Sequence, residues 1–161
     1  MTLNLAALTA LFRKLGAPNP ESWAQSQLTE GIDQLSRFVF LRQAWRQVPP
    51  ATDTSWMEAQ VAAAEKRSDQ PGAGAGHALK RLLADGANRE DLHTVVRTMQ
   101  WELLHGLCYL LDDPGTLEPE VENLQWALVR VDEDGNAVGP IGGLHESVLE
   151  TDPTGREMRP A

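Results

Sequence analysis

One segment constrains the fold more than any other: residues 89–111, which read REDLHTVVRTMQWELLHGLCYLL. Apolar side chains recur there at steps of three and four residues, the spacing of one helix face; they are Leu92, Val96, Met99, Leu103 and Leu110. Past Leu103 the opposite side is apolar as well, and it carries Leu104, Leu107, Cys108 and Leu111. A helix that is apolar all round is typically buried all round. We therefore expect residues 101–111 to lie at the centre of the fold, covered in part by residues 112–161.

Helical spacing of apolar residues predicts four further helices before this segment, at residues 3–15, 21–48, 55–67 and 77–84. Gly16 suits the left-handed position that closes the first of them, and Pro20 suits the first turn of the second. Gly31 is a point at which the long second helix bends or breaks. The stretch SDQPGAGAG, residues 68–76, predicts a flexible connection, and Gly86 predicts the turn into the fifth helix.

The periodicity changes after residue 111. Residues 124–131, LQWALVRV, are rich in β-branched and aromatic side chains, and residues 137–141 follow them after the turn DEDGN, which predicts a hairpin. The remaining segment, residues 139–160, predicts a strap that closes the fold. The expected fold class is mainly α: a bundle of about five helices with a small C-terminal β-hairpin and an extended C-terminal strap. We expect one domain, 1–161, with a helical core at 1–111.

The net charge of −9 is confined to one part of the chain. Residues 1–111 contain 11 acidic and 11 basic residues, whereas residues 112–161 contain 12 acidic and 3 basic residues. An acidic surface argues against nucleic acid as a partner, because duplex binding relies on cations that replace phosphate counterions. It favours a basic partner, a metal, or solubility alone. The single cysteine excludes an internal disulfide, so we expect a cytoplasmic protein, and no segment is long and apolar enough to span a membrane.

Two pairs with Glu-x-x-His spacing fall on the fifth helix, Glu90 with His93 and Glu102 with His105. They lie roughly 18 Å apart along the helix axis, so they cannot share one ion. Glu102 and His105, together with His145, are the candidates for a metal site. A wider candidate pocket consists of Trp101, Glu102, His105, His145 and Glu146. No catalytic residue and no cofactor are predicted.

Three further motifs favour ordinary structural roles. The turn DEDGN resembles the start of a calcium-binding loop, but Ala137 and Gly143 stand where that loop needs a glycine and a glutamate. The stretch PGAGAGHALKR lacks the spacing of a phosphate-binding loop. Residues 77–99 could form a DNA-binding helix–turn–helix that presents Arg89, His93 and Arg97, although such helix pairs are common in any bundle.

Three functional hypotheses follow. The first is a non-enzymatic interaction protein, of the adaptor or inhibitor type, whose acidic C-terminal surface binds a protein partner or a second copy. The alternative is a small-molecule or metal-binding protein, or an enzyme, with a pocket near Trp101, His105 and His145. The third is a helix–turn–helix DNA binder.

Overall fold

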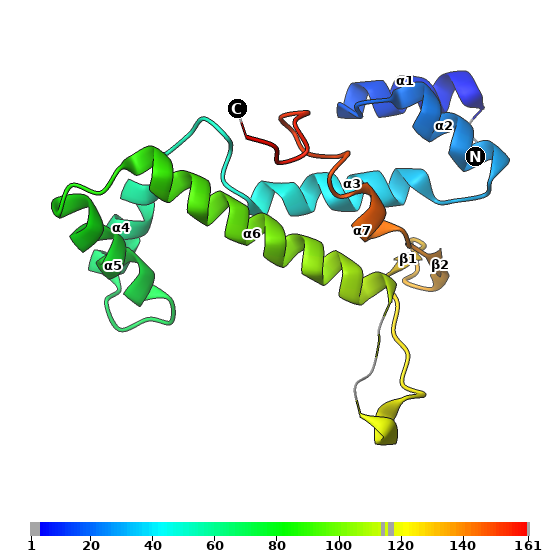
Figure 1. Ribbon diagram of the computed structural model, residues 1–161. Coiled ribbons are helices and arrows are strands. Elements are labelled where there is room, and N and C mark those ends of the chain that lie inside the picture. Colours follow the sequence, from blue (N-terminus) through cyan, green and yellow to red (C-terminus); the bar gives the residue numbers. More distant parts are fainter. Residues whose placement is uncertain (1–3, 114, 116–117, 161) are drawn as a thin grey trace. The chain divides into compact units, whose positions relative to one another are not determined.

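The computed structural model describes residues 4–113, 115 and 118–160. These residues form seven α-helices and one two-stranded antiparallel sheet (Figure 1), which confirms the predicted mainly helical fold with a C-terminal hairpin. Contacts between Cα atoms divide the chain into two compact units. Unit 1 comprises residues 1–45 and 102–161, and unit 2 comprises residues 46–101. That the whole chain acts as one domain stays a prediction.

Three helices open unit 1: α1 (Leu5–Leu15), α2 (Pro20–Thr29) and α3 (Gln34–Ala44), followed by the short 3₁₀ helix η1 (Trp45–Gln47). Gly16 ends α1 in the predicted left-handed conformation, with φ 83°. The segment predicted to be helical over residues 21–48 is broken at Gly31, where the sequence predicts a bend or a break, and it forms α2 and α3. Gly31 has φ 74° at that break, a conformation that strains other L-residues. Asp33 then starts α3 by accepting a hydrogen bond from the Ser36 amide at 3.2 Å.

Unit 2 contains a tightly packed pair, α4 (Trp56–Lys66) and α5 (Ala73–Ala84). The two helices approach most closely at Gly76. A Cβ atom there would lie 2.5 Å from the Cβ atom of Ala64 and 2.5 Å from the carbonyl oxygen of Gln60. The predicted flexible connection over residues 68–76 is therefore too long, since α5 begins at Ala73 and its glycines belong to the helix.

The long helix α6 (Arg89–Asp112) begins as predicted, with Gly86 left-handed at φ 82° before it. The Asn88 side chain accepts hydrogen bonds from the first amides of α6, at 2.8 Å from the Glu90 nitrogen. The boundary between unit 2 and unit 1 falls within this helix, after Trp101.

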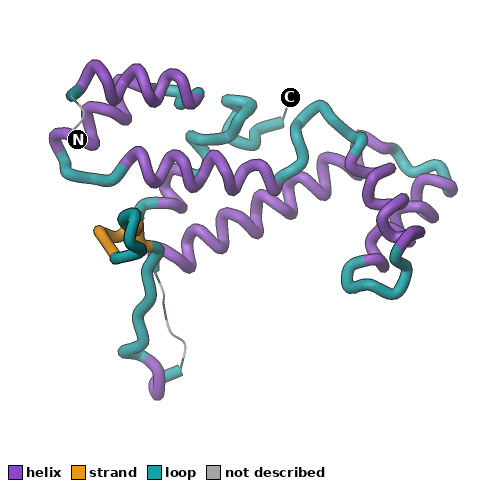
Figure 2. The backbone as a smooth tube through the Cα atoms, turned by 180° about the vertical axis from the view of Figure 1, so that it is seen from behind, coloured by secondary structure: helices purple, strands orange, loops and turns teal. Residues whose placement is uncertain are grey.

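The C-terminal part of unit 1 contains the short 3₁₀ helix η2 (Pro119–Val121), the strands β1 (Val129–Val131) and β2 (Ala137–Pro140), and α7 (Leu144–Ser147). The hairpin lies next to α7 (Figures 1 and 2). In its turn, the Asp132 carboxylate accepts hydrogen bonds from the amides of Asn136 at 2.8 Å and Asp134 at 3.0 Å. The Asn136 amide is the main reason that the pKa of Asp132 is lowered. These contacts are typical of a hairpin turn, in which backbone amides donate to the carboxylate.

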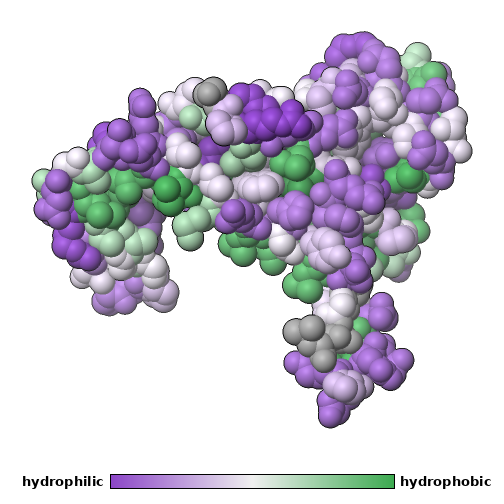
Figure 3. All heavy atoms as spheres, in the orientation of Figure 1, coloured by the Kyte–Doolittle hydropathy of each residue, from purple (hydrophilic) through white to green (hydrophobic). Residues whose placement is uncertain are grey.

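The expectation that residues 101–111 are buried on every side is wrong. Leu103 is 64% exposed, Leu107 50% and Leu110 46%, whereas Cys108 on the opposite side is 1% exposed. Figure 3 shows hydrophobic side chains, in green, at the surface where α6 runs in Figure 1. The side of α6 that bears Cys108 is therefore enclosed, and the leucine side is open.

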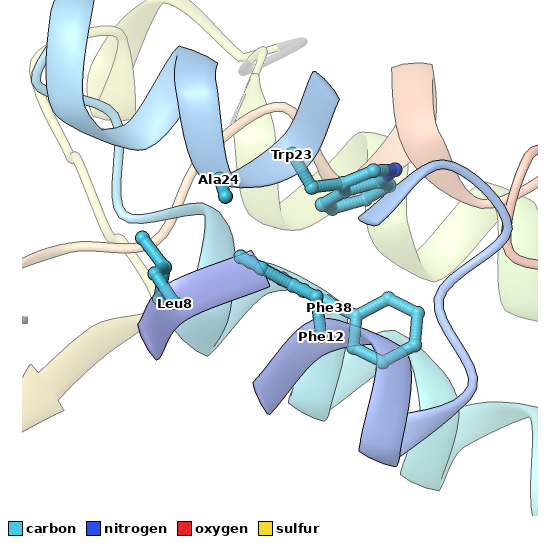
Figure 4. Close-up of a cluster of buried hydrophobic side chains, with 5 residues drawn as sticks. All are labelled: Leu8, Phe12, Trp23, Ala24 and Phe38. Atoms are coloured by element: carbon cyan, nitrogen blue, oxygen red, sulfur yellow. The ribbon is translucent and has the colours of Figure 1, made fainter. Parts of the chain in front are cut away.

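The core of unit 1 is an aromatic cluster between α1, α2 and α3. Phe12, Trp23 and Phe38 pack against one another with ring centroids 5.4 to 6.0 Å apart, and Leu8 and Ala24 complete the cluster (Figure 4). Tilted and edge-on pairs of this kind contribute about 0.5–1.5 kcal/mol each beyond the burial of their area.

The C-terminal strap is held to this helical layer by two tryptophans. The Trp23 indole donates a hydrogen bond to a Glu150 carboxylate oxygen at 3.0 Å, and the Trp45 indole donates to the Val148 carbonyl at 2.9 Å. Leu144 and Val148 are fully buried. The strap thus supplies both apolar side chains and hydrogen-bond acceptors to unit 1.

Candidate functional site

The exposed side of α6 within unit 1 is the most unusual surface of the chain. It consists of Leu103, Gly106, Leu107 and Leu110, which we call the α6 face. Residues three and four apart lie on the same side of a helix, so the three leucines form one continuous apolar strip. A Cβ atom at Gly106 would have no neighbour within 4 Å, so the backbone there is open to close approach.

A second segment extends this apolar strip. The Trp126 indole donates a hydrogen bond to the Leu110 carbonyl at 2.9 Å. That carbonyl belongs to the last turn of α6, where backbone oxygens have no partner within the helix. Trp126 is 39% exposed and Leu124 is 58% exposed. Both residues were predicted to lie in a strand, but the strand begins at Val129. The indole of Trp126 is instead bonded to the end of α6.

The part of the sequence that contains these leucines carries charged side chains of one sign. Between Arg97 and Arg130 the sequence contains no lysine or arginine. The same interval, residues 98–129, contains six carboxylates, and we call it the acidic stretch; they are Glu102, Asp112, Asp113, Glu118, Glu120 and Glu122. Arg130, the next cation, is occupied by Asp33, with Nε 2.6 Å from the carboxylate. The sequence interval that contains the leucines is therefore acidic throughout.

Most of these carboxylates are available to a partner. Glu118, Glu120 and Glu122 are exposed. Among the residues that the structure describes, neither they nor Glu102 and Asp113 form an ion pair. Of the six carboxylates, Asp112 is the one with an ion-pair partner among the described residues, and its side chain is buried.

Asp112 and His145 form the one buried charged contact near the end of α6 that the structure describes. The Asp112 side chain is 6% exposed, and its Oδ2 atom lies 2.6 Å from His145 Nδ1. The same oxygen accepts a hydrogen bond from the His145 amide at 2.8 Å. The Tyr109 ring meets the imidazole edge-on, with centroids 4.9 Å apart. This contact fixes the start of α7 against the last turn of α6.

Cys108 lies on the enclosed side of the same turn. Burial raises the pKa of its thiol to about 11, and the nearby Asp112 carboxylate adds to the shift. Reactive cysteines need an electropositive and accessible setting, so Cys108 is the inert core thiol that the sequence suggests.

Of the predicted pocket residues, Trp101, Glu102 and His105 lie on α6, and His145 and Glu146 lie on α7. That they form one pocket stays a prediction. Glu102 and Glu146 are exposed, and His145 is engaged by Asp112. Within the described part of the chain, no group of three or more His, Cys, Asp or Glu side chains is placed to hold a metal. Sequence reasoning found His145 and missed Asp112 as its partner.

The residues predicted to read DNA are occupied inside unit 2. His93 is 5% exposed and accepts a hydrogen bond from the Trp56 indole at 2.9 Å. Arg97 is 8% exposed and donates to the Pro49 carbonyl. Arg89 pairs with Glu58. His93 and Arg97 are buried and therefore do not project from the helix as a base-reading surface requires.

The glycine-rich stretch likewise has a structural role. Gly74 and Gly76 lie inside α5, and Lys80 pairs with Glu65 at 2.5 Å. The phosphate-binding alternative needs these glycines in a loop and this lysine free.

Comparisons with family models, with curated proteins and with solved structures find no significant match to this chain. None of the described helices combines the length and the apolar composition needed to cross a lipid bilayer.

Proposed function

We propose that this protein is a non-enzymatic interaction protein that binds a basic protein partner through the acidic stretch of unit 1. The observation that carries the proposal is the coincidence of exposed apolar side chains with uncompensated carboxylates. Leu103 and Leu107 are at least half exposed, and the interval around them has six carboxylates and no lysine or arginine. Apolar contact supplies affinity to such an interface, and complementary charge supplies encounter rate and selectivity.

The charge distribution also argues for a partner rather than for solubility alone. A surface that only needs to stay soluble mixes both signs of charge and avoids exposed apolar clusters. Unit 1 does the opposite at the end of α6, where leucines and carboxylates occur together. A basic partner would cover the leucines and neutralise the carboxylates in one step.

The test measures the binding of poly-L-lysine to the full chain by calorimetry, at low and at high salt. Exposed charges interact strongly only within a Debye length, which falls from about 30 Å at 0.01 M salt to about 8 Å at 0.15 M. We expect the affinity to drop about ten-fold or more over that range. An affinity that does not change with salt would refute the proposal.

Two matched variants locate the binding surface. Glu118→Gln/Glu120→Gln/Glu122→Gln removes three exposed carboxylates from the acidic stretch. Glu30→Gln/Asp69→Asn/Asp85→Asn removes three exposed carboxylates from elsewhere and leaves the same net charge. We expect the first variant to bind poly-L-lysine more weakly than the second. Equal weakening by the two would show that only the net charge matters, and would count against a dedicated surface.

A further inference from the structure

We infer that the partner presents a cationic amphipathic helix, which lies along the α6 face with its apolar side on Leu103, Leu107 and Leu110. This inference rests on the proposed function and specifies both the site and the chemistry of the partner. It makes the leucines, and not the carboxylates alone, the main determinant of affinity.

The first argument is the shape of the α6 face. Three leucines spaced by four and three residues form a straight apolar strip that spans two turns of helix, roughly 10 Å. A second helix packs against such a strip by placing its own side chains between the leucines. Gly106 lies within the strip and has open space where a side chain would be, so a partner helix can approach the backbone of α6 there.

The second argument is the charge at the edges of the strip. Glu102 directly precedes Leu103 on α6, and Asp113 directly follows the end of the helix; both carboxylates are exposed. Trp126 is bonded to the last turn of α6 through the Leu110 carbonyl. A helix whose polar side carries lysines or arginines therefore meets carboxylates beyond the apolar contact, as in other recognition of basic amphipathic helices.

The same charges argue against two other occupants. A second copy of this chain would bring its own acidic stretch against the first, and like charges across an interface are unfavourable. An anionic lipid surface attracts basic segments, and no lysine or arginine occurs anywhere between Arg97 and Arg130.

The experiment uses the full chain and a synthetic leucine–lysine peptide of about four turns, whose leucines repeat with helical spacing. A scrambled peptide of the same composition has the same charge but no apolar side. We expect the amphipathic peptide to bind at least about ten-fold more tightly than the scrambled one, because only the former can cover the leucines.

Substitutions on the α6 face provide the decisive comparison. Leu103→Gln/Leu107→Gln replaces two exposed leucines by a residue of similar helix propensity, so the helix should remain intact. Leu28→Gln/Leu82→Gln is the control, because those leucines are 43% and 45% exposed and lie elsewhere. We expect the first variant to lose about ten-fold in affinity for the amphipathic peptide and to bind the scrambled peptide as before. The control should bind both peptides like the unmodified chain.

The outcomes separate this inference from the proposed function. If the leucine variant binds the amphipathic peptide as tightly as the unmodified chain does, the inference is wrong, while salt-dependent binding of poly-L-lysine would still support a basic partner. If neither peptide nor poly-L-lysine binds, both fail. A dimer of the unmodified chain that Leu103→Gln/Leu107→Gln dissociates would also overturn the inference, because a second copy would then occupy the α6 face.

Should the double substitution reduce the melting temperature, Gly106→Gln offers an independent test. It adds a side chain to the α6 face in open space, where no described atom lies within 4 Å, and leaves the leucines in place. We expect it to weaken binding of the amphipathic peptide selectively, and unchanged binding would contradict close approach of a helix at this position.

Discussion

Asp112 ends α6 with a carboxylate, at the helix terminus where the backbone dipole favours a cation. Its side chain is also 6% exposed, and a buried carboxylate needs donors. His145 provides two contacts to one oxygen, Oδ2, through its ring and its amide. The sequence places an acidic residue in the last turn of a helix, without a lysine or arginine close to it along the chain. This pattern indicates that a residue distant in sequence donates to the carboxylate. Which donor it is depends on the path of the strap.

Asp33 combines two roles at residue scale, since it caps α3 and pairs with Arg130. Burial raises the pKa of Asp33, but hydrogen bonds from Ser36 and Arg130 outweigh this effect, so the pKa is lowered overall. A carboxyl group whose pKa is lower in the folded state adds stability above its unfolded pKa. That stability is lost as the pH falls through the folded pKa.

We therefore expect Asp33→Asn to reduce the free energy of unfolding at neutral pH by about 0.5 kcal/mol, a small value because the Arg130 side chain is 47% exposed. Asparagine keeps the cap, so the loss reports the charge. The difference should decrease as the pH falls below about 4, the unfolded pKa of aspartate, and vanish only below the lower folded pKa. Urea titrations of both proteins across this pH range measure it, and a deficit that persists at the lowest pH would contradict an electrostatic origin.

At the scale of elements, glycine decides two features of the fold by different means. Gly31 separates α2 from α3 because its positive φ ends helical hydrogen bonding. Gly76 acts inside α5, where its missing side chain lets α4 approach. The sequence shows both glycines but does not show which of them is inside a helix, because that depends on the neighbouring helix.

Substitution of Gly76 tests this packing. In Gly76→Ala the new methyl group would overlap the Gln60 carbonyl, which is backbone and cannot turn aside. We expect a loss of about 1–3 kcal/mol in the free energy of unfolding of unit 2, as for other overpacked contacts.

Gly74→Ala is the matched control, because the same helix has nothing within 4 Å of that position. It should leave stability unchanged or raise it by up to about 1 kcal/mol, through helix propensity. Thermal melts of the two variants compare them directly. A Gly76→Ala protein as stable as Gly74→Ala would mean that α4 and α5 do not pack this closely.

At the scale of the whole molecule, the C-terminal residues combine two properties that the composition alone does not connect. They carry the entire net charge, and they also provide the fully buried Leu144 and Val148 to unit 1. The acidic third is therefore not a loose tail. Residues 144–148 are structural, whereas Glu118, Glu120 and Glu122 are exposed.

Removal of residues 141–161 should consequently destabilise unit 1. Burial of two aliphatic side chains contributes about 3–6 kcal/mol, a large part of the roughly 5–15 kcal/mol that stabilises a typical domain. We expect unit 1 of the shortened chain to lose its cooperative thermal transition. The transition is measured by tryptophan fluorescence, to which Trp23 and Trp45 contribute.

Removal of residues 159–161 alone is the control and should leave the melting temperature within a few degrees, because the contacts described for Arg159 are with its near neighbours Arg156 and Glu157. A chain lacking residues 141–161 that melts as sharply as the intact protein would show that the strap is not part of the core.

The sequence by itself determined what depends on near neighbours along the chain. It predicted most helices, the left-handed turns at Gly16 and Gly86, the hairpin turn and the acidic character of the last third, because helical spacing, left-handed glycines and charge are local properties. It also singled out His145. Only the tertiary structure decided that Asp112 holds His145, that α4 and α5 meet at Gly76, and that Leu103, Leu107 and Leu110 remain exposed. The sequence pattern of an apolar helix side is the same whether or not other parts of the protein cover it. Only the positions of distant segments distinguish a core from a binding surface.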